Sequence, residues 1–263
     1  MSPAISFIEK SVGENTPFLA VVWFVAPHTP VAAGPENRAA YDSLPMREQH
    51  WFGAISALDA QVGRLRNTLR KLRVEDDTLL WFCSDNGPSW VHELGSAGPL
   101  RGRKGDVYEG GIRVPSIVSW PRGIGGGRVV DRTVSTLDFL PTLVAATKSS
   151  PRLPLLDGED VLPLLRGTAD RRRGPVYFDY PSREGSDTWK AGETRQVAVI
   201  EGEWKLVSVN DGKHFELYDL DHDIGEATDV AAKQPALVKR LRESLDAWAT
   251  SCAGSLKGGD YRK

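Results

Sequence analysis

Two uninterrupted apolar runs, separated by one long amphipathic stretch, constrain the fold of this 263-residue chain more than any other feature. Residues 18–25, and residues 78–83 after the opening Thr78, are apolar without alternation, which is typical of strands buried on both faces of a helix-covered parallel sheet. Between the runs, apolar side chains recur every three or four positions and predict an amphipathic helix over residues 45–73. The helix positions are Trp51, Ile55, Leu58, Val62, Leu65, Leu69 and Leu72. The order strand, helix, strand predicts βαβ units and a parallel sheet.

A change of pattern divides the chain in two. A third expected strand, residues 114–120, precedes a segment rich in proline, glycine and arginine at residues 149–175. We therefore expect one domain over residues 1–165 and a second over residues 166–263. The first is expected to be an α/β fold, part of a parallel-rich sheet flanked by helices.

The second domain is expected to hold a small antiparallel sheet and one helix. Strands are expected at residues 176–178, 196–209 and 215–220. The last two are separated by Asn-Asp-Gly at residues 210–212, a strong hairpin turn. Apolar positions of the closing helix are Leu237, Leu241, Leu245 and Trp248. The three arginines at positions 171–173 are expected to be a solvated charge run.

Composition excludes several classes of protein. The formal net charge is −2, which gives no case for nucleic acid or an anionic membrane surface. The longest apolar run is about half of what a membrane span needs, so no span is expected. The first ten residues lack the pattern of a signal peptide, and the compartment is left open. Cys83 and Cys252 allow at most one disulfide, which the sequence does not decide.

Polar residues follow both apolar runs. His28 lies between prolines after the first run, and Asp85 and Asn86 follow the second. Functional groups gather at the carboxyl ends of strands in parallel sheets. Asp and Asn supply hard oxygen ligands suited to Ca²⁺ or Mg²⁺. A structural histidine and an ordinary turn are the simpler alternatives.

Residues 98–113 form a glycine-rich, cationic segment. Its charged side chains include Arg101, Arg103, Lys104 and Arg113. Glycine lets the backbone approach closely, so such a loop can bring ammonium and guanidinium groups to a phosphate or sulfate. The segment lacks the phosphate-binding Gly-x4-Gly-Lys-Ser/Thr pattern, and a basic surface loop is the alternative.

Taken in order, several short motifs resemble the sulfatase family, specifically arylsulfatase-like enzymes of the alkaline phosphatase superfamily. The matching pieces are Ala26-Pro27-His28-Thr29-Pro30, Leu58-Asp59-Ala60-Gln61-Val62-Gly63, Ser84-Asp85-Asn86-Gly87, Lys104-Gly105, Tyr108-Glu109-Gly110-Gly111-Ile112-Arg113-Val114-Pro115, Leu137-Asp138-Phe139-Leu140-Pro141-Thr142-Leu143, Leu156-Asp157-Gly158, Glu203-Trp204-Lys205-Leu206 and Leu217-Tyr218-Asp219-Leu220. Together they span nearly the whole chain. The resemblance implies an alkaline phosphatase-like sheet and the hydrolysis of sulfuric esters.

The resemblance also implies roles for particular residues. His28 matches the histidine that contacts the sulfate ester and protonates the leaving alcohol, and Lys104 matches the lysine that holds a sulfate oxygen. Asp85 and Asn86 match two ligands of an active-site Ca²⁺. A sulfated small molecule or glycan is the implied partner. Substrate-contacting candidates lie in a variable loop and are Trp90, His92 and Glu93.

The family nucleophile is a formylglycine made from the first residue of a Cys/Ser-x-Pro-x-Arg motif. Neither cysteine lies in that motif, and residues 179–183 carry Asp in its first position. We expect the formylglycine, and an Asp-Asp pair that completes the metal site, only in a segment upstream of this chain. The chain is thus expected to be the C-terminal part of a sulfatase and inactive by itself.

Two other functions remain open at this point. The chain could be a catalytically inert remnant or anion-binding module, or part of a phosphate or phosphonate ester hydrolase of the same superfamily. Family members are often periplasmic, secreted or lysosomal. The sulfate ester, the oligomeric state and the compartment of this protein are not determined by its sequence.

Overall fold

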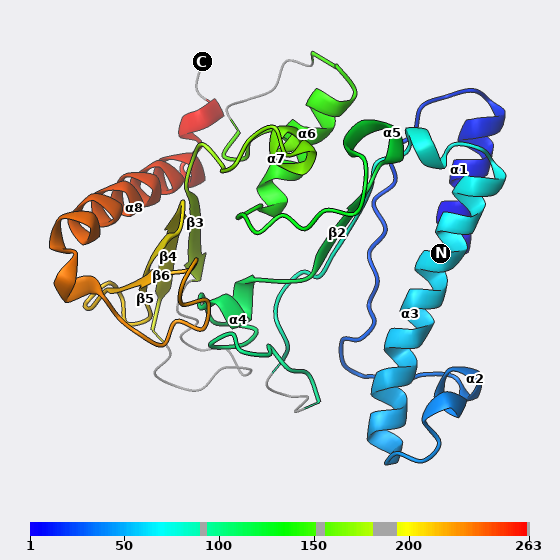
Figure 1. Cartoon of the computed structure of the whole chain (residues 1–263), viewed down its shortest axis with the longest axis horizontal. Coiled ribbons are helices and arrows are strands. Elements are labelled where there is room, and N and C mark those ends of the chain that lie inside the picture. Colours follow the sequence, from blue (N-terminus) through cyan, green and yellow to red (C-terminus); the bar gives the residue numbers. More distant parts are fainter. Residues whose placement is uncertain (90–93, 151–155, 181–193, 262–263) are drawn as a thin grey trace. The chain divides into compact units, whose positions relative to one another are not determined.

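The computed structural model describes residues 1–89, 94–150, 156–180 and 194–261 (Figure 1). The chain divides into two compact units. The first consists of Met1–Trp81 and Val118–Gly126, and the second of Phe82–Ile117 and Gly127–Lys263. These units interleave in the sequence and differ from the two expected domains. The domain boundary at residue 165 stays a prediction.

Helices dominate the first unit. They are α1 (Ser2–Gly13), α2 (Pro35–Arg38), the 3-10 turn η1 (Ala39–Tyr41), α3 (Met46–Lys71), η2 (Glu75–Asp77) and α5 (Pro121–Ile124). The expected helix over residues 45–73 is therefore confirmed as α3. Its Leu65 and Leu69 pack with Ile5 and Ile8 of α1 in a buried cluster. The C-terminal part of the apolar stripe therefore faces the core, whereas Ile55 nearer its start is 42% exposed.

The expected buried strand at residues 18–25 is not a strand in the structure. This segment runs without regular secondary structure, as the blue coil that connects α1 to α2 in Figure 1. Its odd-numbered side chains are exposed: Leu19 67%, Val21 71%, Trp23 91% and Val25 77%. The physical reason is that no strand among the described residues pairs with this segment, so half of its apolar side chains face outward.

Two expected strands of the first sheet are confirmed. They are β1 (Leu80–Cys83) and β2 (Ser116–Ser119), which form a two-stranded sheet. The division into units passes through both strands, after Trp81 in β1 and after Ile117 in β2. The short helix α4 (Glu109–Ile112) lies between them in the sequence.

The second unit contains the expected antiparallel sheet. Its strands are β3 (Val176–Tyr180), β4 (Gln196–Glu201), β5 (Trp204–Ser208) and β6 (Glu216–Asp219), paired in that order. The single strand expected at residues 196–209 is wrong, because the chain reverses between β4 and β5. Gly202 has a φ of 61° there, a conformation that suits glycine. Helix α8 (Pro235–Leu256) buries Leu241 and Leu245 against the sheet.

Further helices complete the second unit. They are η3 (Thr136–Asp138), α6 (Phe139–Ala146), α7 (Leu162–Arg166), η4 (Ala231–Lys233) and η5 (Gly259–Tyr261). Ser135 and Asp138 form a capping box at the start of η3. Among the described residues, no helix is long and apolar enough to cross a membrane.

Candidate anion-binding site

The turn that follows β1 is closed by its own hydrogen bonds. Asp85 Oδ1 accepts from Asn86 N at 3.0 Å, and Asn86 Nδ2 donates to the Gly87 carbonyl at 2.9 Å. Ser84 Oγ donates to the Asn86 carbonyl at 3.1 Å. Asp85 is exposed and Asn86 half-buried. The turn therefore presents a carboxylate and an amide from a fixed backbone.

Backbone contacts join this turn to the glycine-rich segment. Lys104 N donates to the Pro88 carbonyl at 3.0 Å, and Gly87 N donates to the Gly111 carbonyl at 2.9 Å. A Cβ at Gly87 would lie 1.8 Å from the Gly110 carbonyl oxygen, so only glycine permits this approach. The structure thus brings the Asp85–Asn86 turn and the Lys104 loop together.

The Gly110–Gly111 pair also supports the loop itself. Gly110 N donates to the Arg101 carbonyl at 2.6 Å. A Cβ at Gly110 would lie 2.2 Å from the Gly102 carbonyl oxygen, and a Cβ at Gly111 would lie 2.0 Å from that of Asp106. Within the described ranges, no carboxylate forms an ion pair with the half-buried Lys104. Its ammonium is therefore not neutralised there by the fold.

A buried ionic cluster lies next to this glycine pair. Lys205, on β5, is 0% exposed and its Nζ lies 2.9 Å from Glu109 Oε1 and 2.8 Å from Glu226 Oε1. Glu226 Oε2 accepts from Glu109 N at 2.7 Å. Burial raises the pKa of the Glu226 carboxyl, and the Lys205 ammonium opposes that shift. No sequence pattern assigned a role to these three residues, although all of them lie in or near family-like motifs.

The Lys205–Glu226 contact is an ion pair and not a well-aligned hydrogen bond, since Glu226 Oε1 has no hydrogen-bond partner among the described residues. The far side of the cluster carries a fourth charge. Arg113 Nη1 donates to Glu109 Oε2 at 3.2 Å, which brings two cations to the two carboxylates. Buried charges persist in proteins when they are paired in this way.

A second network ties the loop to β6. The Arg101 guanidinium lies 3.8 Å from the centre of the Tyr108 ring and donates to Tyr218 Oη at 2.7 Å and to Glu216 Oε2 at 3.1 Å. Glu216 Oε2 also accepts from Tyr108 Oη at 2.8 Å and from Tyr218 Oη at 2.5 Å. Burial and the hydrogen bonds to Glu216 raise the pKa of both phenols above their usual range.

The expected metal ligands Asp85 and Asn86 make up only part of a metal site. Asp85 and Asn86 offer hard oxygens that suit Ca²⁺, but a Ca²⁺ ion takes roughly six to eight oxygen ligands. No group of three or more His, Cys, Asp or Glu side chains that could hold a metal occurs among the described residues. These two residues therefore fit part of a calcium site. Both cysteines are free, so there is no Cys83–Cys252 disulfide.

The remaining predicted residues lie elsewhere. His28 belongs to the first unit, where it is exposed and its Nδ1 lies 2.9 Å from the Thr29 carbonyl oxygen. Lys104 belongs to the second unit, so its proximity to His28 stays a prediction. Trp90, His92 and Glu93 lie outside the described residues.

A nucleophile-like motif occurs once in the chain, although the resemblance predicts one only upstream of it. Ser43-Leu44-Pro45-Met46-Arg47 matches Ser-x-Pro-x-Arg. Ser43 is exposed and lies two residues before Pro45, the N-cap of α3. In the family-like order the motif precedes the segment ending at His28, whereas Ser43 follows it. The pattern is therefore present, but at a different place from the one that the resemblance implies.

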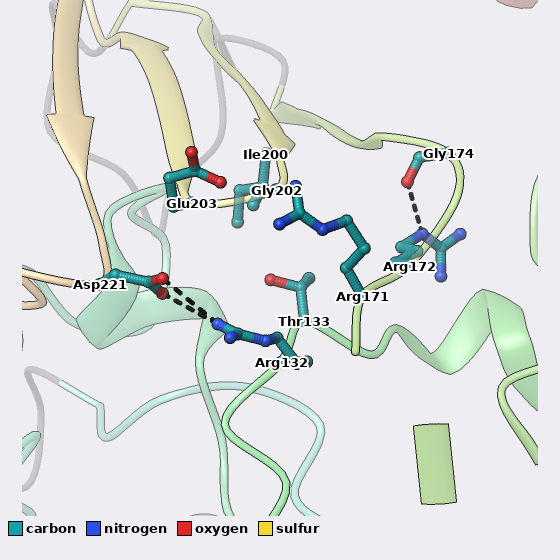
Figure 2. Close-up of a pocket in the computed structure, with 9 residues that line it drawn as sticks. All are labelled: Arg132, Thr133, Arg171, Arg172, Gly174, Ile200, Gly202, Glu203 and Asp221. Carbon is teal, nitrogen blue, oxygen red and sulfur yellow. Dashed lines mark hydrogen bonds and ion pairs between the residues drawn. The ribbon is translucent and has the colours of Figure 1, made fainter. Parts of the chain in front are cut away.

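Figure 2 shows a small hollow in the second unit that is separate from these residues. It is lined by Arg132, Thr133, Arg171, Arg172, Gly174, Ile200, Gly202, Glu203 and Asp221. Arg132 Nη1 lies 3.2 Å from Asp221 Oδ1, and Arg172 Nε donates to the Gly174 carbonyl at 2.9 Å. Two of its arginines are thus engaged, and it contains none of the predicted site residues.

Comparisons with known proteins give a consistent result. The Sulfatase family model matches residues 2–149, and the model for the C-terminal region of N-sulphoglucosamine sulphohydrolase matches residues 103–250. The chain is 34% identical over 188 residues to steryl-sulfatase from Homo sapiens, covering 67% of this chain and 30% of that protein. It therefore spans about a third of that relative.

Solved structures agree with this fold. Ps i-CgsB in complex with k-i-k-neocarrahexaose superimposes with a TM-score of 0.82 and 28% identity, covering 94% of this chain and 53% of that one. The phosphonate monoester hydrolase of Agrobacterium radiobacter gives a TM-score of 0.55 at 26% identity, covering 78% and 41%. Because the Sulfatase model covers more than half of its residues and the fold agrees, this chain belongs to the sulfatase family, with an alkaline phosphatase-like fold.

Proposed function

We propose that this chain forms the sulfate-holding part of a sulfuric ester hydrolase. The observation that carries the proposal is the backbone contact between the Lys104 loop and the Asp85–Asn86 turn. It gathers an unneutralised ammonium, a carboxylate and an amide on adjoining segments. A sulfate monoester carries negative charge on its non-bridging oxygens, and charge builds on the leaving oxygen as the ester bond breaks.

In this proposal Lys104 donates to a non-bridging sulfate oxygen and fixes the orientation of the ester. His28, when protonated, donates its proton to the leaving oxygen as a general acid. Asp85 and Asn86 supply part of the ligand set of a Ca²⁺ ion. Such a cation, when bound, neutralises charge on the sulfate oxygens.

Sulfated small molecules or glycans are the proposed substrates. Support comes from the relatives, since one is a steryl-sulfatase and another structure holds a neocarrahexaose. Trp90 and His92 are proposed to contact the part of the substrate beyond the sulfate. We further propose that the 263 residues alone do not hydrolyse sulfate esters, because the family nucleophile is expected upstream.

Titration of the chain with inorganic sulfate, followed by amide NMR at matched ionic strength, tests the binding role. The Lys104→Ala variant is expected to lose about tenfold to a hundredfold in affinity, since a hydrogen bond to a charged group is worth about 1.5–3 kcal/mol. The matched control is Lys213→Ala, which removes an exposed lysine of the same unit. Equal sulfate affinity of Lys104→Ala and the unaltered chain would contradict the proposal.

Calcium and turnover are tested separately. Added Ca²⁺ is expected to raise sulfate affinity in the unaltered chain but not in Asp85→Ala. Release of phenol from an aryl sulfate by the 263-residue chain with Ca²⁺ would refute its proposed inactivity.

A phosphonate ester hydrolase is the second candidate, favoured by the likeness to the Agrobacterium phosphonate monoester hydrolase. Tighter binding of phenylphosphonate than of phenyl sulfate would favour it. If neither anion shifts the Lys104 and Gly110 amides, the site has no anion-holding role.

A further inference from the structure

We propose that the buried Lys205–Glu109–Glu226 cluster positions the Lys104 loop against the Asp85–Asn86 turn, so that these three residues are positioning residues of the sulfate site. The inference rests on the proposed function for the role of Lys104 itself. Its structural part, the control of the loop by the cluster, stands on contacts alone.

The first step is the link from the sheet to α4. Lys205 is the second residue of β5, paired with Ile200 of β4 and Tyr218 of β6. Its Nζ lies 2.9 Å from Glu109 Oε1, and Glu109 is the first residue of α4. Because β4 and β6 pair with β5 on both sides, the backbone of Lys205 is held in place. Its ammonium therefore anchors Glu109, and with it the start of α4.

The second step fixes α4 at its backbone. Glu226 accepts from Glu109 N at 2.7 Å while it lies 2.8 Å from Lys205. Glu109 is therefore held both at its amide and at its carboxylate. The charged groups of Lys205, Glu109 and Glu226 are buried away from water and have few alternative partners. Displacement of α4 would therefore leave the Lys205 ammonium without the Glu109 carboxylate.

The third step runs from α4 to the site. Gly110 and Gly111 directly follow Glu109. Gly110 N donates to the Arg101 carbonyl at 2.6 Å, and the Gly111 carbonyl accepts from Gly87 N at 2.9 Å. Since a Cβ at Gly87 or Gly110 would overlap the facing backbone, these segments have little freedom to slide. A shift of Glu109 would thus be passed to both Lys104 and Asp85.

Amide hydrogen exchange of the full chain, followed by NMR, tests this inference without a ligand. In Lys205→Met, the amides of Gly87, Lys104 and Gly110 are expected to exchange about tenfold faster or more, as in local opening. Amides in the middle of α8, around Leu245, are expected to keep their rates. Lys213→Met is the matched control, because it makes the same substitution at a lysine of the same unit that is 75% exposed and lies outside the cluster.

Two outcomes would overturn the inference. One is unchanged exchange of the three loop and turn amides in Lys205→Met. The other is equal acceleration in α8 and in the loop, which would mean a purely structural role. If Lys205→Met does not fold, Glu109→Gln replaces it, with the same localised pattern expected at about threefold or more and unchanged rates contradicting the inference.

A sulfate titration then separates this inference from the proposed function. Lys205→Met is expected to bind inorganic sulfate more weakly than Lys213→Met does, while its Lys104 side chain is intact. If the unaltered chain shows no sulfate binding, the proposed function fails, and the exchange result still decides whether the cluster positions the loop. If Lys205→Met binds sulfate as tightly as the unaltered chain, the positioning role is refuted.

Discussion

The Asp138 carboxylate is fully buried and pairs with the guanidinium of Arg172, whose side chain is 6% exposed. The same carboxylate accepts from Ser135 N and Glu159 N at 2.8 and 2.9 Å. Arg172 therefore does not belong to a solvated charge run, as its sequence context predicted. Its neighbours Arg171 and Arg173 do fit that prediction, with side chains 66% and 80% exposed.

Replacement of Arg172 by Met is expected to destabilise the protein by about 3–5 kcal/mol, because it leaves a buried carboxylate without its cation. Urea denaturation followed by circular dichroism measures this change. Arg171→Met and Arg173→Met are the matched controls, with expected changes within about 0.5 kcal/mol for exposed positions. Equal stabilities of all three variants would show that the Asp138–Arg172 pair contributes nothing.

Stability is expected to fall at alkaline pH because of Tyr108 and Tyr218. Burial and their hydrogen bonds to Glu216 raise the pKa of both phenols above the ordinary value of about 10. The unfolded chain then loses protons above about pH 10 while the folded chain keeps them, so stability is full below that pH and is lost as the pH rises. The slope is at most about 1.4 kcal/mol per pH unit for each tyrosine.

Urea denaturation at pH 9, 10 and 11 measures this loss. The double variant Tyr108→Phe/Tyr218→Phe is expected to lower the starting stability and to flatten the alkaline slope. An unchanged slope in the double variant would assign the alkaline loss to other groups.

The exposed apolar row at residues 19–25 is expected to drive aggregation of the isolated chain. Val21→Thr combined with Trp23→Thr should raise the soluble fraction in light scattering, because both side chains are exposed. The melting temperature should stay the same. Phe18→Thr serves as the contrast, since Phe18 packs on the Ile5–Leu69 cluster and its loss should lower the melting temperature. Unchanged scattering in the double variant would show that the row is not the cause.

Ser43 is expected to remain an ordinary serine despite its Ser-x-Pro-x-Arg context. The reason is its place after His28, where the family-like order has no nucleophile. A hydrazide probe for aldehydes, followed by peptide mass spectrometry, measures the modification after co-expression with a maturation enzyme that oxidises the serine of this motif to formylglycine. Labelling that disappears in Ser43→Ala would contradict the expectation and place a formylglycine within this chain.

Local pattern was sufficient for much of the architecture. The three- and four-residue spacing from Trp51 to Leu72 predicted α3, and the short apolar segments predicted β1, β2 and the antiparallel sheet. The apolar pattern gave wrong strands where the pairing of one strand with another decides whether a segment is a strand. Residues 18–25 have a strand-like composition but no partner strand among the described residues. Residues 196–209 read as one strand because the turn at Gly202 is short and the flanking segments are equally apolar.

The sequence by itself determined the family, because its motifs occur in a characteristic order, and it singled out Lys104, Asp85 and Asn86 as adjoining candidates by chemistry and position. Only the tertiary structure decided which charges are buried together. Lys205 and Glu109 are 96 positions apart, and the motifs that contain them give neither residue a role. Burial is a property of the assembled sheet and loop, so no local pattern could reveal that these two side chains meet away from water.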